Sequence, residues 1–185
     1  MPARQVVGGE ENMSAVPENY WQIISPLIVK AREFLEKGET LAPIAFVGSF
    51  STGKVIPVLL QAASDEAKDN SALSIRMAAQ TVDADFVFVL MEAWSLRKDK
   101  LLQVEKIMEQ YGSIGASPYA IDVVSMALET RHGVWMAQVP IKAKGYSKKK
   151  RTMGPPTFQH FAEYEGRFAN LLPKKEDDEQ PSTLH

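Results

Sequence analysis

One short apolar run, Phe-Val-Phe-Val-Leu-Met at positions 86–91, constrains the fold more than any other part of the chain. Its side chains do not alternate between apolar and polar, so both faces of a strand built from them must be covered. The run therefore predicts a central β-strand with other elements packed on both sides. It is also the longest apolar run, far below the roughly 20 residues that a membrane-spanning helix needs. We therefore expect no membrane partner.

Helical periodicity, in which apolar residues recur every three or four positions, marks three segments outside the C-terminal region. These segments are 18–37, 65–82 (with Ser64 as its N-cap) and 97–111. In the second helix, the expected buried stripe consists of Ala67, Leu73, Met77 and Ala78, and Ile75 is a further candidate. The same spacing predicts a last amphipathic helix near the C-terminus, through Phe158, Phe161, Tyr164, Phe168, Leu171 and Leu172.

Extended segments occur as pairs joined by short turns, which is typical of β-hairpins. The first pair is 41–50 and 55–63, and the second is 121–130 and 134–142. Together with the central strand, they predict an α+β fold. We expect a mixed, mainly antiparallel sheet of about five strands with three to four packed helices.

Composition divides the chain into one predicted domain with polar ends. We expect a flexible lead over 1–17, a single α+β domain over 18–172 with a basic linker at 142–156, and a disordered polar tail over 173–185. The 185 residues include no cysteine, which excludes disulfides, cysteine-ligated metals and a thiol nucleophile. The N-terminus has no apolar targeting segment, so we expect a soluble, cytoplasmic protein.

A motif similar to the phosphate-binding P-loop runs from Gly48 to Lys54. In a true P-loop, the lysine reaches the phosphates, the next residue is a Ser or Thr that holds Mg²⁺, and a helix begins there. Here the next residue is Val55, and the branched run after it favours a strand. We therefore interpret 48–54 mainly as a hairpin turn, with Lys54 in solvent, and keep a phosphate- or nucleotide-handling enzyme as an alternative.

Carboxylates and histidines offer weaker candidates for chemistry. Glu92 directly follows the apolar strand, where it is either half-buried with a shifted pKa or a salt-bridged residue at the strand exit. Other carboxylates near predicted strand ends are Asp83, Asp85, Asp122 and Glu129. The three histidines, His132, His160 and His185, are scattered. We predict no catalytic residue, metal site or cofactor from this set.

A cluster of positive charge lies between the second hairpin and the predicted last helix. It consists of Lys142, Lys144, Lys148, Lys149, Lys150 and Arg151. Such a cluster can neutralise phosphates and release counterions, and Tyr146 within it can stack on a base. Against this, the chain as a whole has a formal net charge of −2, and the acidic tail can screen the cluster.

Two short segments resemble a loose group of small uncharacterised bacterial proteins. They are the strand that ends in Glu92-Ala93-Trp94 and the later hairpin with Glu129-Thr130 before Gly133. The resemblance covers about 40% of the chain and implies no activity. It supports the strand assignments and makes Glu92 and Trp94 ligand candidates.

These observations favour a non-enzymatic binding or interaction module that uses a sheet edge or the 142–151 segment. A nucleic-acid-binding accessory protein is the first alternative, and the phosphate-handling enzyme is the second. Possible partners are another protein, a second copy of the chain, or a nucleic acid.

Overall fold

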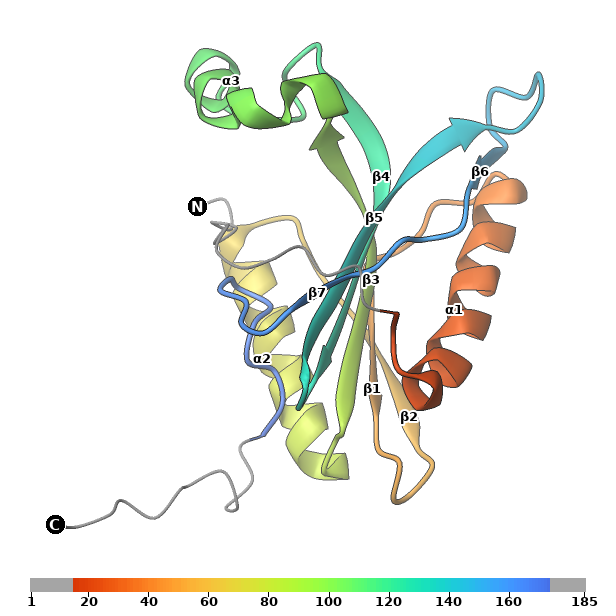
Figure 1. Ribbon diagram of the computed structural model, residues 1–185, viewed down its shortest axis with the longest axis vertical. Coiled ribbons are helices and arrows are strands. Elements are labelled where there is room, and N and C mark those ends of the chain that lie inside the picture. The colour runs from red at the N-terminus through yellow and green to blue at the C-terminus, as the bar shows by residue number, and fades with distance from the viewer. Residues whose placement is uncertain (1–14, 174–185) are drawn as a thin grey trace, which may run out of the picture.

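The computed structural model describes residues 15–173 and contains an antiparallel sheet curled into a half-barrel, with helices on both faces (Figure 1). The predicted α+β class and mainly antiparallel sheet are confirmed. Most of the expected lead, and the tail from 174 onwards, lie outside the described residues. The helices are α1 (Glu18–Glu36), α2 (Asp65–Val82) and α3 (Val104–Tyr111), with a 3₁₀ helix η1 (Lys98–Gln103).

The sheet has seven strands rather than about five. They are β1 (Ile44–Gly48), β2 (Val55–Leu59), β3 (Phe86–Leu96), β4 (Ala120–Thr130), β5 (Gly133–Ala143), β6 (Arg151–Met153) and β7 (Gln159–Phe161). Their order is β2-β1-β3-β4-β5-β6, and β7 also pairs with β5. Both predicted hairpins, β1–β2 and β4–β5, are present.

The central strand β3 is covered on both faces, as its unbroken apolar run predicts. Phe86, Phe88 and Leu90 pack with α1, whereas Val87 and Val89 pack with α2. We call these two sides the α1 face and the α2 face of the sheet. Because side chains alternate along a strand, this division tells which face each β3 residue occupies.

The buried stripe of α2 differs from the predicted one. Leu73 and Met77 are exposed, whereas the residues that face the sheet are Ser71, Ala72, Ile75 and Ala79. Both stripes have helical spacing, so the spacing alone does not distinguish them. Ser64 is the N-cap as predicted, and its Oγ accepts a hydrogen bond from the Ala67 N–H at 3.0 Å.

The predicted last helix is wrong, because its apolar residues belong to two different clusters. Phe158 packs on the α1 face, while Phe168, Leu171 and Leu172 pack on the α2 face. The chain between them forms β7 and then irregular backbone. Spacing of three and four residues therefore arises here from a segment that crosses from one face to the other.

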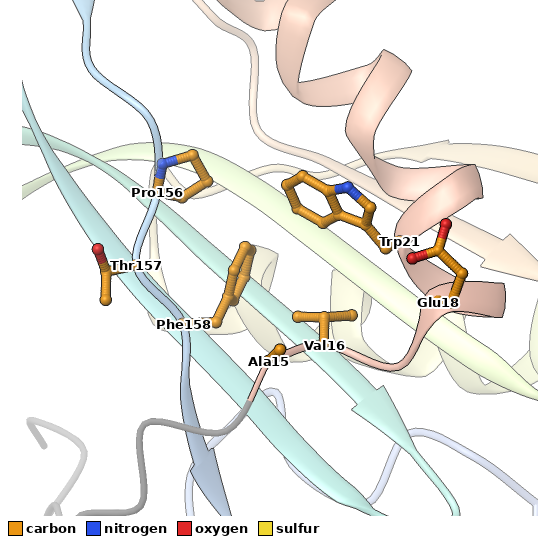
Figure 2. Close-up of a pocket in the computed structure, with 7 residues that line it drawn as sticks. All are labelled: Ala15, Val16, Glu18, Trp21, Pro156, Thr157 and Phe158. Carbon is orange, nitrogen blue, oxygen red and sulfur yellow. The ribbon is translucent and has the colours of Figure 1, made fainter.

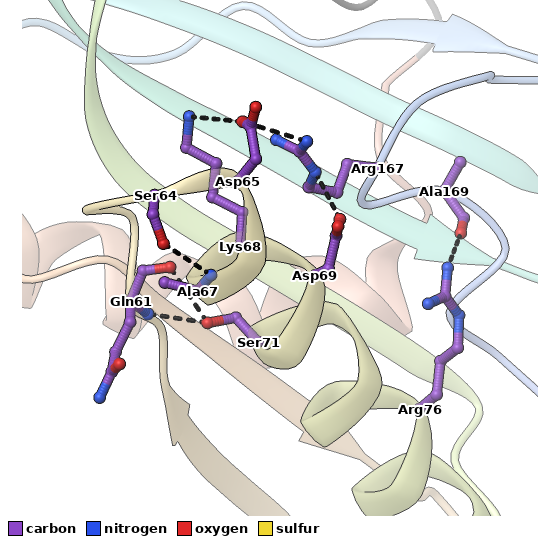
Figure 3. Close-up of polar contacts among 10 residues, drawn as sticks. All are labelled: Gln61, Ser64, Asp65, Ala67, Lys68, Asp69, Ser71, Arg76, Arg167 and Ala169. Carbon is purple, nitrogen blue, oxygen red and sulfur yellow. Dashed lines mark hydrogen bonds and ion pairs between the residues drawn. The ribbon is translucent and has the colours of Figure 1, made fainter. Parts of the chain in front are cut away.

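Polar contacts hold this C-terminal segment against α2 (Figure 3). Arg167 forms ion pairs with Asp65 and Asp69, and Arg76 donates a hydrogen bond to the Ala169 carbonyl at 3.1 Å. From the sheet, the Glu129 carboxylate accepts hydrogen bonds from the Leu171 and Leu172 N–H groups. The segment is thus fixed by specific partners rather than by helical hydrogen bonds.

The sheet splits into two arms at one end. The β3–β4 pairing continues to Leu96↔Ala120, but the β4–β5 pairing ends at Val123↔Pro140. Beyond that point β5 pairs with β6 instead. Figure 1 shows the result at its upper end, with the β3–β4 arm leading to α3 and the β5–β6 arm separate from it. The notch is our name for the place in the sheet where these two arms diverge, at Val123↔Pro140.

Within residues 15–173, no helix combines the length and the apolar character needed to cross a bilayer.

Candidate nucleic-acid interface

The segment that resembles a P-loop is the turn of the β1–β2 hairpin, as the leading interpretation predicted. Val55 begins β2 instead of a helix, and Lys54 is exposed in the turn. Gly48 serves packing, since a Cβ there would overlap ring atoms of Phe86. The geometry that a P-loop uses to hold phosphates, a loop followed by a helix N-terminus, is therefore absent at 48–54.

Glu92 forms a two-pronged ion pair with Arg151. Each Glu92 carboxylate oxygen accepts a hydrogen bond from an Arg151 guanidinium nitrogen at 2.9 Å. The carboxylate also accepts the Leu41 N–H at 2.9 Å. Burial alone would raise the pKa of Glu92, but the hydrogen bonds from Arg151 and Leu41 and the Arg151 charge together lower that pKa. Glu92 therefore stays ionised as a structural partner of Arg151.

Trp94 lies two residues beyond Glu92 on β3, so both side chains project from the α1 face. Its side chain is 63% exposed, although it is the largest kind of apolar side chain. A Cβ on Gly115 would come within 2.6 Å of the indole ring, so the ring rests against that glycine. Asp122 lies directly opposite on β4 and shares the same face. Trp94 is thus held in place while most of its surface faces solvent.

The basic segment is not a linker but the β5–β6 hairpin. The Lys144 N–H donates to the Lys150 carbonyl at 2.9 Å and closes the hairpin, and Gly145 takes the positive φ that the turn requires. Ser147 Oγ accepts the N–H groups of Lys149 and Lys150. The positive charge of this segment therefore lies on the tip of a hairpin with a defined backbone conformation.

The six cations of this segment fall into two groups. Lys144 pairs with Glu36 at 3.1 Å and Arg151 pairs with Glu92, so these two charges hold the hairpin to the body of the protein. Among the described residues, no ion pair involves the other four, which are all exposed: Lys142, Lys148, Lys149 and Lys150. Tyr146 at the tip is fully exposed. We call Tyr146 and Lys148–Lys150 the basic tip.

The Glu92–Arg151 pair connects two sites that were predicted separately: the ligand candidates on β3 and the basic segment. Arg151 begins β6 directly after the basic tip, while Glu92 lies on β3 beside Trp94. Their contact brings the base of the β5–β6 hairpin to the α1 face of β3, two residues along that strand from Trp94. Lys54 is not part of this arrangement, because the β1–β2 turn lies at the other end of the sheet (Figure 1).

Sequence reasoning missed Glu36, which holds the hairpin through two contacts. Its carboxylate pairs with Lys144 and accepts a hydrogen bond from the Thr152 hydroxyl at 2.8 Å. Glu36 ends α1, so no local motif marks it. Partners more than a hundred positions apart in the sequence leave no spacing signal.

The other candidate carboxylates mostly serve the fold. Asp85 accepts the Phe50 N–H across the β1–β2 turn. Burial raises the pKa of Glu129, while hydrogen bonds from the backbone of residues 170–172 act in the opposite direction. His160 stacks on Trp135 and contacts the His132 carbonyl. Over residues 15–173, no group of three or more metal-ligating side chains occurs.

Two hollows lie away from the notch. One, of about 490 Å³, lies between the start of α1 and residues 156–158, with Trp21 and Phe158 facing it (Figure 2). The other, of about 240 Å³, lies between α1 and β1–β2 and is mostly apolar, with Phe34 and Leu59 at its wall. None of the predicted site residues lines either one.

Comparison of the chain with protein-family models, curated proteins and solved structures finds no match in any of the three. Function is therefore inferred from the residues of this chain.

Proposed function

We propose that this protein is a non-enzymatic binding protein and that it binds nucleic acid through the basic tip of the β5–β6 hairpin. The observation that supports this most is the lack of ion-pair partners, among the described residues, for Lys148, Lys149 and Lys150 beside a fully exposed tyrosine. Lysines without carboxylate partners are free to displace counterions from phosphates, which supplies most of the affinity in nonspecific binding.

The basic tip is a local excess of positive charge on a chain whose formal net charge is −2, with 21 basic and 23 acidic residues. Contacts with phosphates depend on this local charge, because interactions between exposed charges are screened beyond about 10 Å.

The competing interaction surface, a free sheet edge, is less suited to binding. β2 is an edge strand. The Leu60 N–H donates to the Pro43 carbonyl, and the Lys54 carbonyl accepts the Ser49 N–H. In this register the backbone N–H and C=O groups of the odd-numbered β2 residues point away from β1. Pro57 occupies the central outward position and has no N–H to donate. A strand from another protein that paired with this edge would therefore lack the central hydrogen bond to β2.

The test is the salt dependence of binding to a labelled oligothymidine of about 20 nucleotides and to a duplex of similar length. We expect affinity to fall steeply between about 50 and 200 mM salt. In the hairpin variant Lys148→Gln/Lys149→Gln/Lys150→Gln, the slope of log K against log salt should decrease by about 2 to 3, since each phosphate contact contributes roughly 0.7 to 0.9.

The matched control, Lys30→Gln/Lys54→Gln/Lys68→Gln, removes the same charge from exposed or ion-paired positions on α1, the β1–β2 turn and α2. It should keep the wild-type slope. Equal slopes in the two variants, or no retention on either nucleic acid at about 50 mM salt, would overturn the proposal.

A further inference from the structure

We infer that the ligand is a single-stranded nucleic acid, one base of which stacks on Trp94 while its backbone contacts the basic tip. This inference rests on the proposed function and adds the strandedness of the ligand and a base-contacting residue.

The two contact surfaces are connected through the Glu92–Arg151 pair. Glu92 and Trp94 both project from the α1 face of β3, and Arg151 reaches that face to pair with Glu92. Arg151 is followed back along the chain by Lys150 and the rest of the basic tip. A nucleic-acid strand that runs from the basic tip toward Trp94 therefore passes from lysines without ion-pair partners to an exposed indole.

Trp94 is suited to stacking because it is exposed yet held. Its ring lies against Gly115, and any side chain larger than glycine at position 115 would overlap the ring. The other two tryptophans serve the core, with Trp135 almost fully buried and Trp21 packed beside Phe158. An indole that remains 63% exposed on a strand loses hydrophobic stabilisation, and a base would recover it.

Charge near Trp94 determines which part of the nucleic acid contacts it. Asp122 shares the face with Trp94, and the Arg151 charge is already neutralised by Glu92. The exposed Asp122 carboxylate would repel phosphates near Trp94, so the nucleic-acid backbone is expected at the basic tip and a base on Trp94. In a duplex both faces of each base are already stacked, and only an unpaired base offers a free face to Trp94 and Tyr146.

The experiment follows tryptophan fluorescence during titration with the same oligothymidine and duplex. We expect the single strand to quench the wild-type protein, and the quenching to be lost in Trp94→Phe but kept in the control Trp21→Phe. Trp94→Ala should weaken single-strand binding roughly tenfold or more, while Trp94→Phe, which retains a ring, keeps most of the affinity. The salt slope should not change, because no lysine is lost.

The outcomes separate this inference from the proposed function. If Trp94→Ala binds the single strand as tightly as the wild type, or if the duplex binds as tightly as the single strand, the stacking inference is overturned while the salt-dependent hairpin contact stands. If neither nucleic acid binds, both fail. Far-UV circular dichroism checks that Trp94→Ala folds, and Trp94→Phe provides the fluorescence test independently of that result.

Discussion

The Glu92–Arg151 pair joins the basic hairpin to β3, and its strength can be measured by a double-mutant cycle. The two single changes are Glu92→Gln, which keeps the shape and still accepts the Leu41 N–H, and Arg151→Met, which keeps the length of the side chain. Both side chains are about one-quarter exposed, at 24% and 27%, so the pair lies between a surface pair and a buried one.

The magnitude follows from that intermediate burial. Surface pairs contribute up to about 1 kcal/mol, whereas removing one partner of a fully buried pair costs about 3 to 5 kcal/mol. We therefore expect each single change to lower the free energy of unfolding by about 2 kcal/mol, and the double change by about 2.5 kcal/mol. The coupling energy is then about 1.5 kcal/mol, and each single change should lower Tm by about 4 to 8 °C.

Urea denaturation followed by circular dichroism provides the free energies, and its pH dependence tests the cause. The pKa of Glu92 in the folded protein lies below its ordinary value of 4.5. The stabilisation is therefore fully present above about pH 5 and is lost as the pH falls through the folded pKa. Coupling should shrink in acid. If the losses in free energy of unfolding from the two single changes add to that of the double change within about 0.5 kcal/mol at neutral pH, the pair is not coupled and the reasoning is refuted.

Two further changes test the packing that positions this site. Gly48→Ala should destabilise the protein by about 1 to 3 kcal/mol, because its Cβ would overlap the Phe86 ring, and Phe86→Leu should rescue part of this loss in the double variant when Tm is compared. An unchanged Tm in Gly48→Ala would contradict the close β1–β3 contact. Glu129→Ala should leave the N–H groups of Leu171 and Leu172 without an acceptor and lower the free energy of unfolding by about 1 to 3 kcal/mol. Hydrogen exchange at these two amides should become faster. Unchanged exchange there would show that Glu129 does not hold the segment.

The central part of the fold could be predicted because its signals are local. The unbroken run at 86–91 identifies a strand covered on both faces, and Ser64 identifies the start of α2. The prediction failed where one spacing of apolar residues fits two different ways of packing the chain. The apolar residues from Phe158 to Leu172 have helical spacing, yet they divide between opposite faces of the sheet.

The candidate site was predicted as separate pieces. Glu92, Trp94 and the basic segment all appear in the sequence as anomalies, but the contact between Glu92 and Arg151 joins positions 59 residues apart. The strand order β3-β4-β5-β6 and the curl of the sheet bring them together. The division of the cations into anchoring and free ones has the same origin, since Glu36 selects Lys144 through tertiary packing.

The most direct test of the account is to map the binding surface by amide chemical shifts during titration with oligothymidine. We predict that the perturbed signals are those of the basic tip and the Trp94 indole N–H, with the Lys54 turn unchanged. Perturbations confined to the apolar hollow between α1 and β2, or to the Lys54 turn, would contradict binding through the β5–β6 hairpin.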